Sequence, residues 1–122
     1  AGASVACYEA HRRASLLAVR NARLAGVDIT NHALADTEVL GDTNHFDVLL
    51  LDPPRSGAKL VCESLFRSPT NISRVVYVSC DVATLARDIK ALANYGFKLL
   101  SVTCFDMFPQ TQHVEVMAVL IR

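Results

Sequence analysis

Apolar residues in this chain gather in short runs that polar and turn-forming residues separate. Two of these runs, 46–51 and 75–78, are almost continuously apolar, which is typical of strands in a parallel sheet with both faces covered. Shorter runs at 4–9 and 29–35 predict two further strands. The runs 98–105 and 114–121 lie close together in sequence, so we expect them to form an antiparallel pair.

Three stretches between these runs carry apolar residues at helical spacing, at 10–25, 59–67 and 82–95. Leu17 and Leu24 belong to the apolar stripe of the first one. Gly26 and Gly96 fit the glycine that commonly follows a helix, and Asp81 is a favourable N-cap. The resulting order, β-α-β-β-α-β-α-β-β, predicts a single α/β domain with a doubly wound sheet.

The amino-acid composition narrows the classes of protein to which this chain could belong. Hydrophobic residues make up 52% of the 122 residues, which is enough for a packed core. Twelve basic and twelve acidic residues balance, and this argues against a nucleic-acid binder that relies on excess positive charge. No apolar run approaches the roughly 20 residues that span a bilayer, and no signal peptide is visible, so we expect a cytoplasmic protein without a membrane segment.

Four widely spaced cysteines form no C-x-x-C pair, which makes a zinc site or a disulfide framework improbable and suggests a reducing compartment. Cys80 differs from the other three in its position, because it directly follows a buried strand and precedes the helix that begins after Asp81. That end of a strand is where α/β sheets bind ligands, and a helix N-terminus favours a thiolate, although the charge of Asp81 opposes it. Taken alone, Cys80 fits a packing role more often than a nucleophile. We assign Cys7, Cys62 and Cys104 to packing.

Asp52, Pro53, Pro54 and Arg55 follow the other buried strand. Two prolines stiffen the backbone and remove two donors, so this segment suits a rigid shelf for a flat ring. A stiff strand-to-helix turn explains it almost equally well.

Other acidic residues stand near predicted strand ends. Glu9 could bond a ribose or simply complement the helix that follows it, and the second interpretation is favoured for this residue alone. Asp36 could accept from an adenine amino group or be a turn residue. Glu115 interrupts an apolar strand, as a general base would, but a position at a solvated strand end explains it more simply. Near it, His113 fits a loop residue better than a general base.

Taken together, residues 51–55, 78–80, 84–88 and 105–115 resemble the C-terminal catalytic domain of the S-adenosylmethionine-dependent RNA uracil-5-methyltransferases. The resemblance covers nearly the whole chain, and the order and spacing of the motifs are specific. It implies that Cys80 is the nucleophile and Glu115 the base. It also implies that Glu9, Asp36 and Asp52 line the pocket for S-adenosyl-L-methionine, and that the 52–55 segment contacts uracil.

The resemblance further implies a reaction on a uridine of tRNA or 23S rRNA. Uracil C5 is a poor nucleophile, so a thiolate first adds to C6, and a base later removes the C5 proton. A uridine inside folded RNA must be flipped out to reach these groups. No metal is expected.

One part of the family pattern is missing from the sequence. No glycine-rich loop is present, and residues 1–3 look like the end of a helix. We therefore expect a Rossmann-like, doubly wound methyltransferase sheet that lacks its first strand and that loop and ends in an antiparallel strand pair. Residues 1–122 would be a partial catalytic domain, inactive alone, with sheet edges open to self-association.

Two alternatives stay open. The neutral charge and the missing loop favour a non-catalytic Rossmann-like module that binds a partner, whereas Asp52, Cys80 and Glu115 together argue against it. Methylation of an amino group by another Asp-Pro-Pro enzyme is weaker, because such enzymes typically carry an aromatic residue where this chain has Arg55.

Overall fold

The computed structural model describes residues 2–32, 43–65, 69–107, 109–111 and 114–122. The chain forms two compact units, Ala1–Gly41 and Asp42–Arg122, and each has its own sheet. The order of helices and strands is the one that the hydrophobic pattern predicts. No helix in the described ranges is long and apolar enough to cross a membrane.

The first unit contains a two-stranded parallel sheet and one helix. Strand β1 (Ala6–Tyr8) pairs with β2 (Thr30–His32), and helix α1 (Arg12–Leu24) connects them. Gly26 has φ +67°, in the left-handed region, and it stands just past the helix as predicted. The predicted apolar stripe of α1 is wrong for Leu17 and Leu24, which are exposed, because two strands of three residues each offer a helix little surface to cover.

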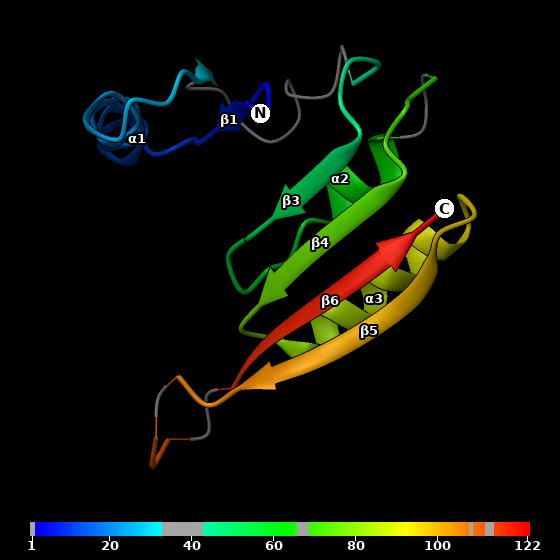
Figure 1. The fold of residues 1–122 in the computed structure, drawn as a ribbon. Coiled ribbons are helices and arrows are strands. Elements are labelled where there is room, and N and C mark those ends of the chain that lie inside the picture. Colours follow the sequence, from blue (N-terminus) through cyan, green and yellow to red (C-terminus); the bar gives the residue numbers. More distant parts are fainter. Residues whose placement is uncertain (1, 33–42, 66–68, 108, 112–113) are drawn as a thin grey trace. The chain divides into compact units, whose positions relative to one another are not determined.

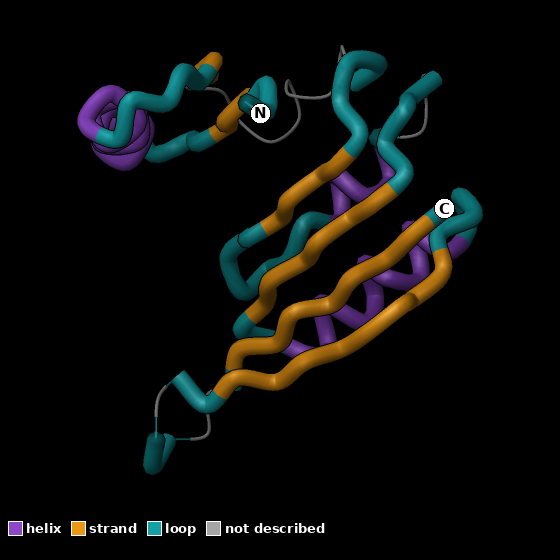
Figure 2. The backbone as a smooth tube through the Cα atoms, viewed as in Figure 1, coloured by secondary structure: helices purple, strands orange, loops and turns teal. Residues whose placement is uncertain are grey.

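The second unit contains a mixed four-stranded sheet of order β3-β4-β6-β5 (Figure 2). Strands β3 (Val48–Leu51) and β4 (Arg74–Ser79) are parallel. Strands β5 (Lys98–Phe105) and β6 (Glu115–Ile121) form the predicted antiparallel pair, and β6 also pairs antiparallel with β4.

Helices α2 (Lys59–Ser64) and α3 (Val82–Ala93) lie on the same face of this sheet (Figure 1). The buried side chains of the strands face them, and the largest is Tyr77. Together with residues of the helices they form the core: Cys62, Leu65, Ile72, Val75, Tyr77, Leu85, Leu92, Phe97, Val116, Ala118 and Leu120.

The prediction that the strand at 46–51 is covered on both faces is wrong for this unit. Val48 and Leu50 are 51% and 67% exposed. Leu49 and Leu51 pair with the buried residues Val75 and Tyr77, so the alternation of side chains along a strand places Val48 and Leu50 on the opposite face. Among the described residues of the second unit, no helix covers that face. The apolar run therefore describes a strand with one buried side and one exposed apolar side.

Candidate active site at the carboxyl ends of β3 and β4

Three residues singled out from the sequence stand at the same end of the second unit's sheet. Asp52 directly follows β3, and Cys80 directly follows the neighbouring parallel strand β4. Glu115 is the first residue of β6, which runs antiparallel to β4. Because Ser79 pairs with Val116, Cys80 and Glu115 occupy the next positions along this ladder. The backbone thus places the cysteine and the carboxylate-bearing residue one position beyond the last pair of the β4–β6 ladder.

The segment from Asp52 to Ala58 connects β3 to α2 at this same end. Pro53 is half-buried, whereas Asp52, Pro54 and Arg55 are exposed. A turn closes the segment, with the Gly57 amide donating to the Pro54 carbonyl at 2.8 Å. The segment therefore has exposed groups at the same end of the sheet as Cys80, which both the shelf and the stiff-turn interpretations allow.

Helix α3 begins immediately after Cys80. The Asp81 carboxylate caps it by accepting from the Thr84 amide at 2.8 Å, and this hydrogen bond lowers the pKa of Asp81. The Ser79 hydroxyl also bonds both the amide and the carbonyl of Asp81, at 3.1 and 3.0 Å. These contacts fix the backbone on both sides of Cys80, which is itself half-buried.

The remaining cysteines occupy three different environments. Cys62 is fully buried, and burial, with the negative charge of Asp88 as a second cause, raises the pKa of its thiol to about 12. Its predicted packing role is confirmed. Cys7 is half-buried. For Cys104 the packing prediction is wrong, since this residue lies on edge strand β5, where every residue is exposed.

A buried polar network beneath the site was not predicted. Asp88 of α3 is fully buried and accepts from the Tyr77 hydroxyl, from the Ala58 amide and from Arg87. Burial and this contact with Asp88 raise the pKa of Tyr77, and the hydrogen bond to Asp88 raises that of Arg87. The sequence does carry a signal, because Asp88 stands three and four residues from Leu85 and Leu92, on the apolar face of the helix.

Glu9 and Asp36, the two acids assigned to the cofactor, have different outcomes. Glu9 directly follows β1, and its carboxylate accepts from the His11 amide at 2.6 Å. This is the helix-opening contact that the simpler interpretation predicts. Beside it, the rings of Tyr8 and His32 stack with centroids 4.6 Å apart, at the carboxyl ends of β1 and β2. Asp36 lies outside the described residues, as does His113.

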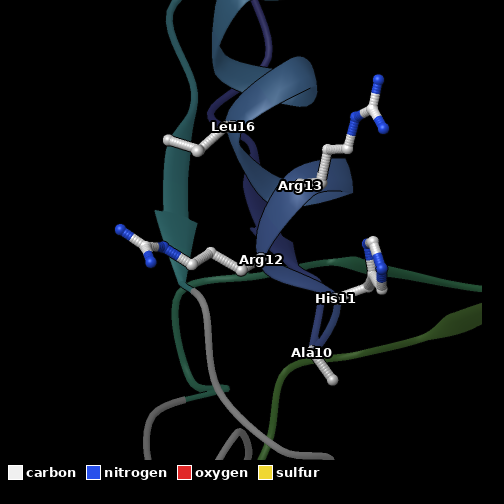
Figure 3. A pocket seen from close by; sticks show the side chains of 5 residues that line it. All are labelled: Ala10, His11, Arg12, Arg13 and Leu16. Atoms are coloured by element: carbon white, nitrogen blue, oxygen red, sulfur yellow. The ribbon is translucent and has the colours of Figure 1, made fainter.

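A shallow depression of the first unit lies at the start of α1 (Figure 3). His11 and Arg13 extend to one side of the helix and Arg12 to the other, so the side chains do not converge on one point. Across the residues with described positions, no group of three or more His, Cys, Asp or Glu side chains could hold a metal ion. The depression is lined by Ala10, His11, Arg12, Arg13 and Leu16.

Comparison with known proteins gives a consistent picture. The profile of a family described as tRNA (Uracil-5-)-methyltransferase matches residues 22–122. The chain is 52% identical over 75 residues to the 23S rRNA (uracil(1939)-C(5))-methyltransferase RlmD of Francisella tularensis subsp. holarctica, covering 61% of this chain and 16% of that protein. It is 45% identical over 100 residues to RlmD of Pseudomonas entomophila, covering 82% of this chain and 21% of that protein.

A solved structure extends the likeness to three dimensions. The crystal structure of Pyrococcus abyssi tRNA (uracil-54, C5)-methyltransferase in complex with S-adenosyl-L-homocysteine matches with a TM-score of 0.84 and 34% identity. The match covers 98% of this chain and 29% of that one, so the chain spans less than a third of the length of these relatives. The fold is thus that of a Rossmann-like methyltransferase sheet.

Proposed function

Because this chain belongs to the tRNA (uracil-5-)-methyltransferase family, we propose that it is part of an enzyme that methylates C5 of an RNA uridine. The observation that carries this proposal is the position of Cys80 just past the end of β4 and of Glu115 at the start of β6, at the end of the sheet where the 52–55 segment follows β3. A soft nucleophile and a carboxylate base are the two groups that this reaction requires.

In the proposed reaction, the Cys80 sulfur forms a bond to uracil C6, and the ring electrons move to give an enolate with carbanion character at C5. S-adenosyl-L-methionine, when bound, supplies an electrophilic methyl group on a sulfonium. After C5 has gained the methyl group, Glu115 takes the C5 proton, the C5–C6 double bond re-forms, and the cysteine leaves as a thiolate. Asp52, Pro53, Pro54 and Arg55 hold the uracil ring in place.

Glu9, Asp36 and Asp52 are the residues proposed to hold the cofactor. The fit of Glu9 is supported by its place at the carboxyl end of β1, next to the stacked rings of Tyr8 and His32. That end of a parallel strand is where α/β folds bind nucleotides. Its hydrogen bond to the His11 amide engages one carboxylate oxygen, Oε1, and fixes the orientation of the group.

The partner of the site is proposed to be tRNA or 23S rRNA, in accord with the names of the relatives. A cytoplasmic location follows from that substrate. Self-association of the 122-residue chain through a sheet edge is also proposed, since β3 is an edge strand of its sheet with exposed apolar side chains.

The first test is a covalent trap. The full-length protein that carries these residues is incubated with S-adenosyl-L-methionine and tRNA or 23S rRNA transcripts containing 5-fluorouridine. A base can remove hydrogen from C5 as a proton but cannot remove fluorine. The adduct between Cys80 and C6 should therefore persist, and the protein–RNA complex should migrate slowly in a denaturing gel. Cys80→Ala should abolish the adduct, and Cys104→Ala should form it fully. An adduct in the Cys80→Ala protein would refute the assignment.

The second test separates the base from the nucleophile. Glu115→Gln keeps the shape of the side chain but accepts no proton, so the methylated intermediate should remain attached to Cys80 even with ordinary uridine. Covalent protein–RNA complexes should therefore accumulate in this variant and not in the unmodified enzyme. Asp47→Asn, which changes an exposed acid at the opposite end of β3 from the site, is the matched control and should turn over normally. Rapid release of product by Glu115→Gln would rule out the proposed base.

A further inference from the structure

Asp88 is the one fully buried charged residue among the described residues. A buried carboxylate is costly unless donors surround it, and pairing it with another charge seldom gives net stability over apolar packing. Its position on the apolar face of α3, in line with Leu85 and Leu92, is one that a leucine would also fill. The charged group therefore calls for an explanation other than packing.

The donors to Asp88 come from three separate segments. On one oxygen, Oδ2, the Tyr77 hydroxyl of β4 donates at 2.7 Å and the Ala58 amide at 2.7 Å. On the other, Oδ1, Arg87 donates through Nε at 2.8 Å, and its Nη2 lies 2.8 Å from the same oxygen in an ion pair. One carboxylate thus ties together β4, helix α3 and the end of the segment that follows β3.

The same face of α3 holds two more backbone groups of that segment. Arg87 Nη2 donates to the Ser56 carbonyl at 2.9 Å, and the Thr84 hydroxyl donates to the Arg55 carbonyl at 3.1 Å. Consecutive turns of one helix therefore hold the backbone at Arg55, Ser56 and Ala58. We call Thr84, Arg87 and Asp88 the α3 clamp.

Helix α3 also begins directly after Cys80, with Asp81 as its cap. Because one helix carries the clamp and starts at Cys80, the clamp sets the position of the 52–55 segment relative to the sulfur of Cys80. A nucleophile must lie about 3–3.5 Å from its target atom, and an error of about 1 Å costs on the order of a hundredfold in rate. Any group that fixes this separation controls the chemical step.

We propose that Asp88 is a positioning residue for uracil methylation, which holds the uracil-contacting segment 52–55 in register with Cys80. This inference rests on the proposed function, since it assumes that Cys80 attacks a ring held by that segment. Asp88 touches neither the ring nor the sulfur, and it acts through Arg87, Ala58 and the helix.

Asp88→Asn is the sharpest variant, because it keeps the volume and removes one acceptor. All the groups around Asp88 donate, so the new amide must face either Arg87 or the pair formed by Tyr77 and Ala58. If the amide nitrogen faces Arg87, the remaining oxygen still accepts from both Tyr77 and Ala58, so this orientation satisfies the most donors. The guanidinium then loses its contact with residue 88, and its hydrogen bond to the Ser56 carbonyl is weakened. Tyr77→Phe removes a single donor, leaves the ion pair intact, and provides a milder second variant.

The experiment measures three quantities in the full-length protein: the single-turnover rate of adduct formation with 5-fluorouridine transcripts, the dissociation constant for that RNA, and the unfolding temperature. Asp88→Asn should slow adduct formation about 10- to 100-fold and leave RNA binding within a factor of about two. Tyr77→Phe should give a smaller loss of rate.

Leu92→Ala is the matched control, because Leu92 is also fully buried, lies one turn further along α3 and does not belong to the clamp. It should lower the unfolding temperature at least as much as Asp88→Asn while leaving the adduct rate nearly unchanged. Equal loss of rate in the two variants would overturn the inference and leave Asp88 a structural residue. An adduct in Cys80→Ala would instead refute the proposed function, so the two failures are distinguishable.

Discussion

At the scale of single residues, Gly57 controls how closely the backbone after β3 approaches helix α3. Its φ is +76°, in the region that side chains rarely adopt, and a Cβ there would lie 2.5 Å from Arg87 Nη2 and 2.6 Å from Asp88 Oδ2. Two costs therefore apply to any other residue at this position, backbone strain and overlap with the clamp.

Gly57→Ala should lower the free energy of unfolding by about 3 kcal/mol, measured by urea denaturation of the 122-residue chain. Gly96→Ala is the control in the same unit. Gly96 has φ +90°, but a Cβ there would make only ordinary contacts, with Arg122 at 3.7 Å, so about 1 kcal/mol should be lost. Equal losses in the two variants would contradict the close approach between Gly57 and α3.

The residue scale also shows where sequence reasoning succeeds and where it stops. Cys80 and Asp52 could be placed at one edge, because buried strands are recognisable and parallel strands end on the same side. Asp88 could not be interpreted in this way, since its role depends on a helix register that brings it against Ala58, thirty residues earlier. The exposure of Cys104 could not be predicted, because an apolar pattern does not reveal whether a strand lies at the edge of a sheet.

At the scale of elements, the two edge strands of the second unit differ. Both carry exposed apolar residues, such as Leu50 on β3 and Leu100 on β5, but the pairing of β3 is regular. β5 has a register irregularity between Leu99 and Ser101, and bulges of this kind discourage pairing with another chain. Self-association should therefore use β3.

This difference can be tested by sedimentation velocity at increasing concentrations of the 122-residue chain. Leu50→Lys places a charge on the β3 edge strand and should shift the chain toward monomer. Leu100→Lys makes the same change at a similarly exposed position, 61% against 67%, but on β5, and should leave the association intact. If both variants associate like the unmodified chain, the β3 edge is not the contact.

At the scale of the whole molecule, the sequence predicted the order of elements, the α/β class and the antiparallel pair. Hydrophobic period and turn residues carry that information locally. The division of the strands between two sheets, and the insertion of β6 between β4 and β5, were not predicted. Strand order depends on which distant edges pair, and a one-dimensional pattern does not contain it.

The insertion of β6 also determines when the site comes into existence during folding. The hairpin of β5 and β6 joins neighbouring segments, so it closes a short loop and can form early. Its docking on β4 bridges a longer stretch of chain that includes α3, and this later event places Glu115 beside Cys80. A chain caught before docking holds a cysteine without its carboxylate. Docking of the hairpin on β4 therefore both completes the sheet and brings Glu115 to the ladder position next to Cys80.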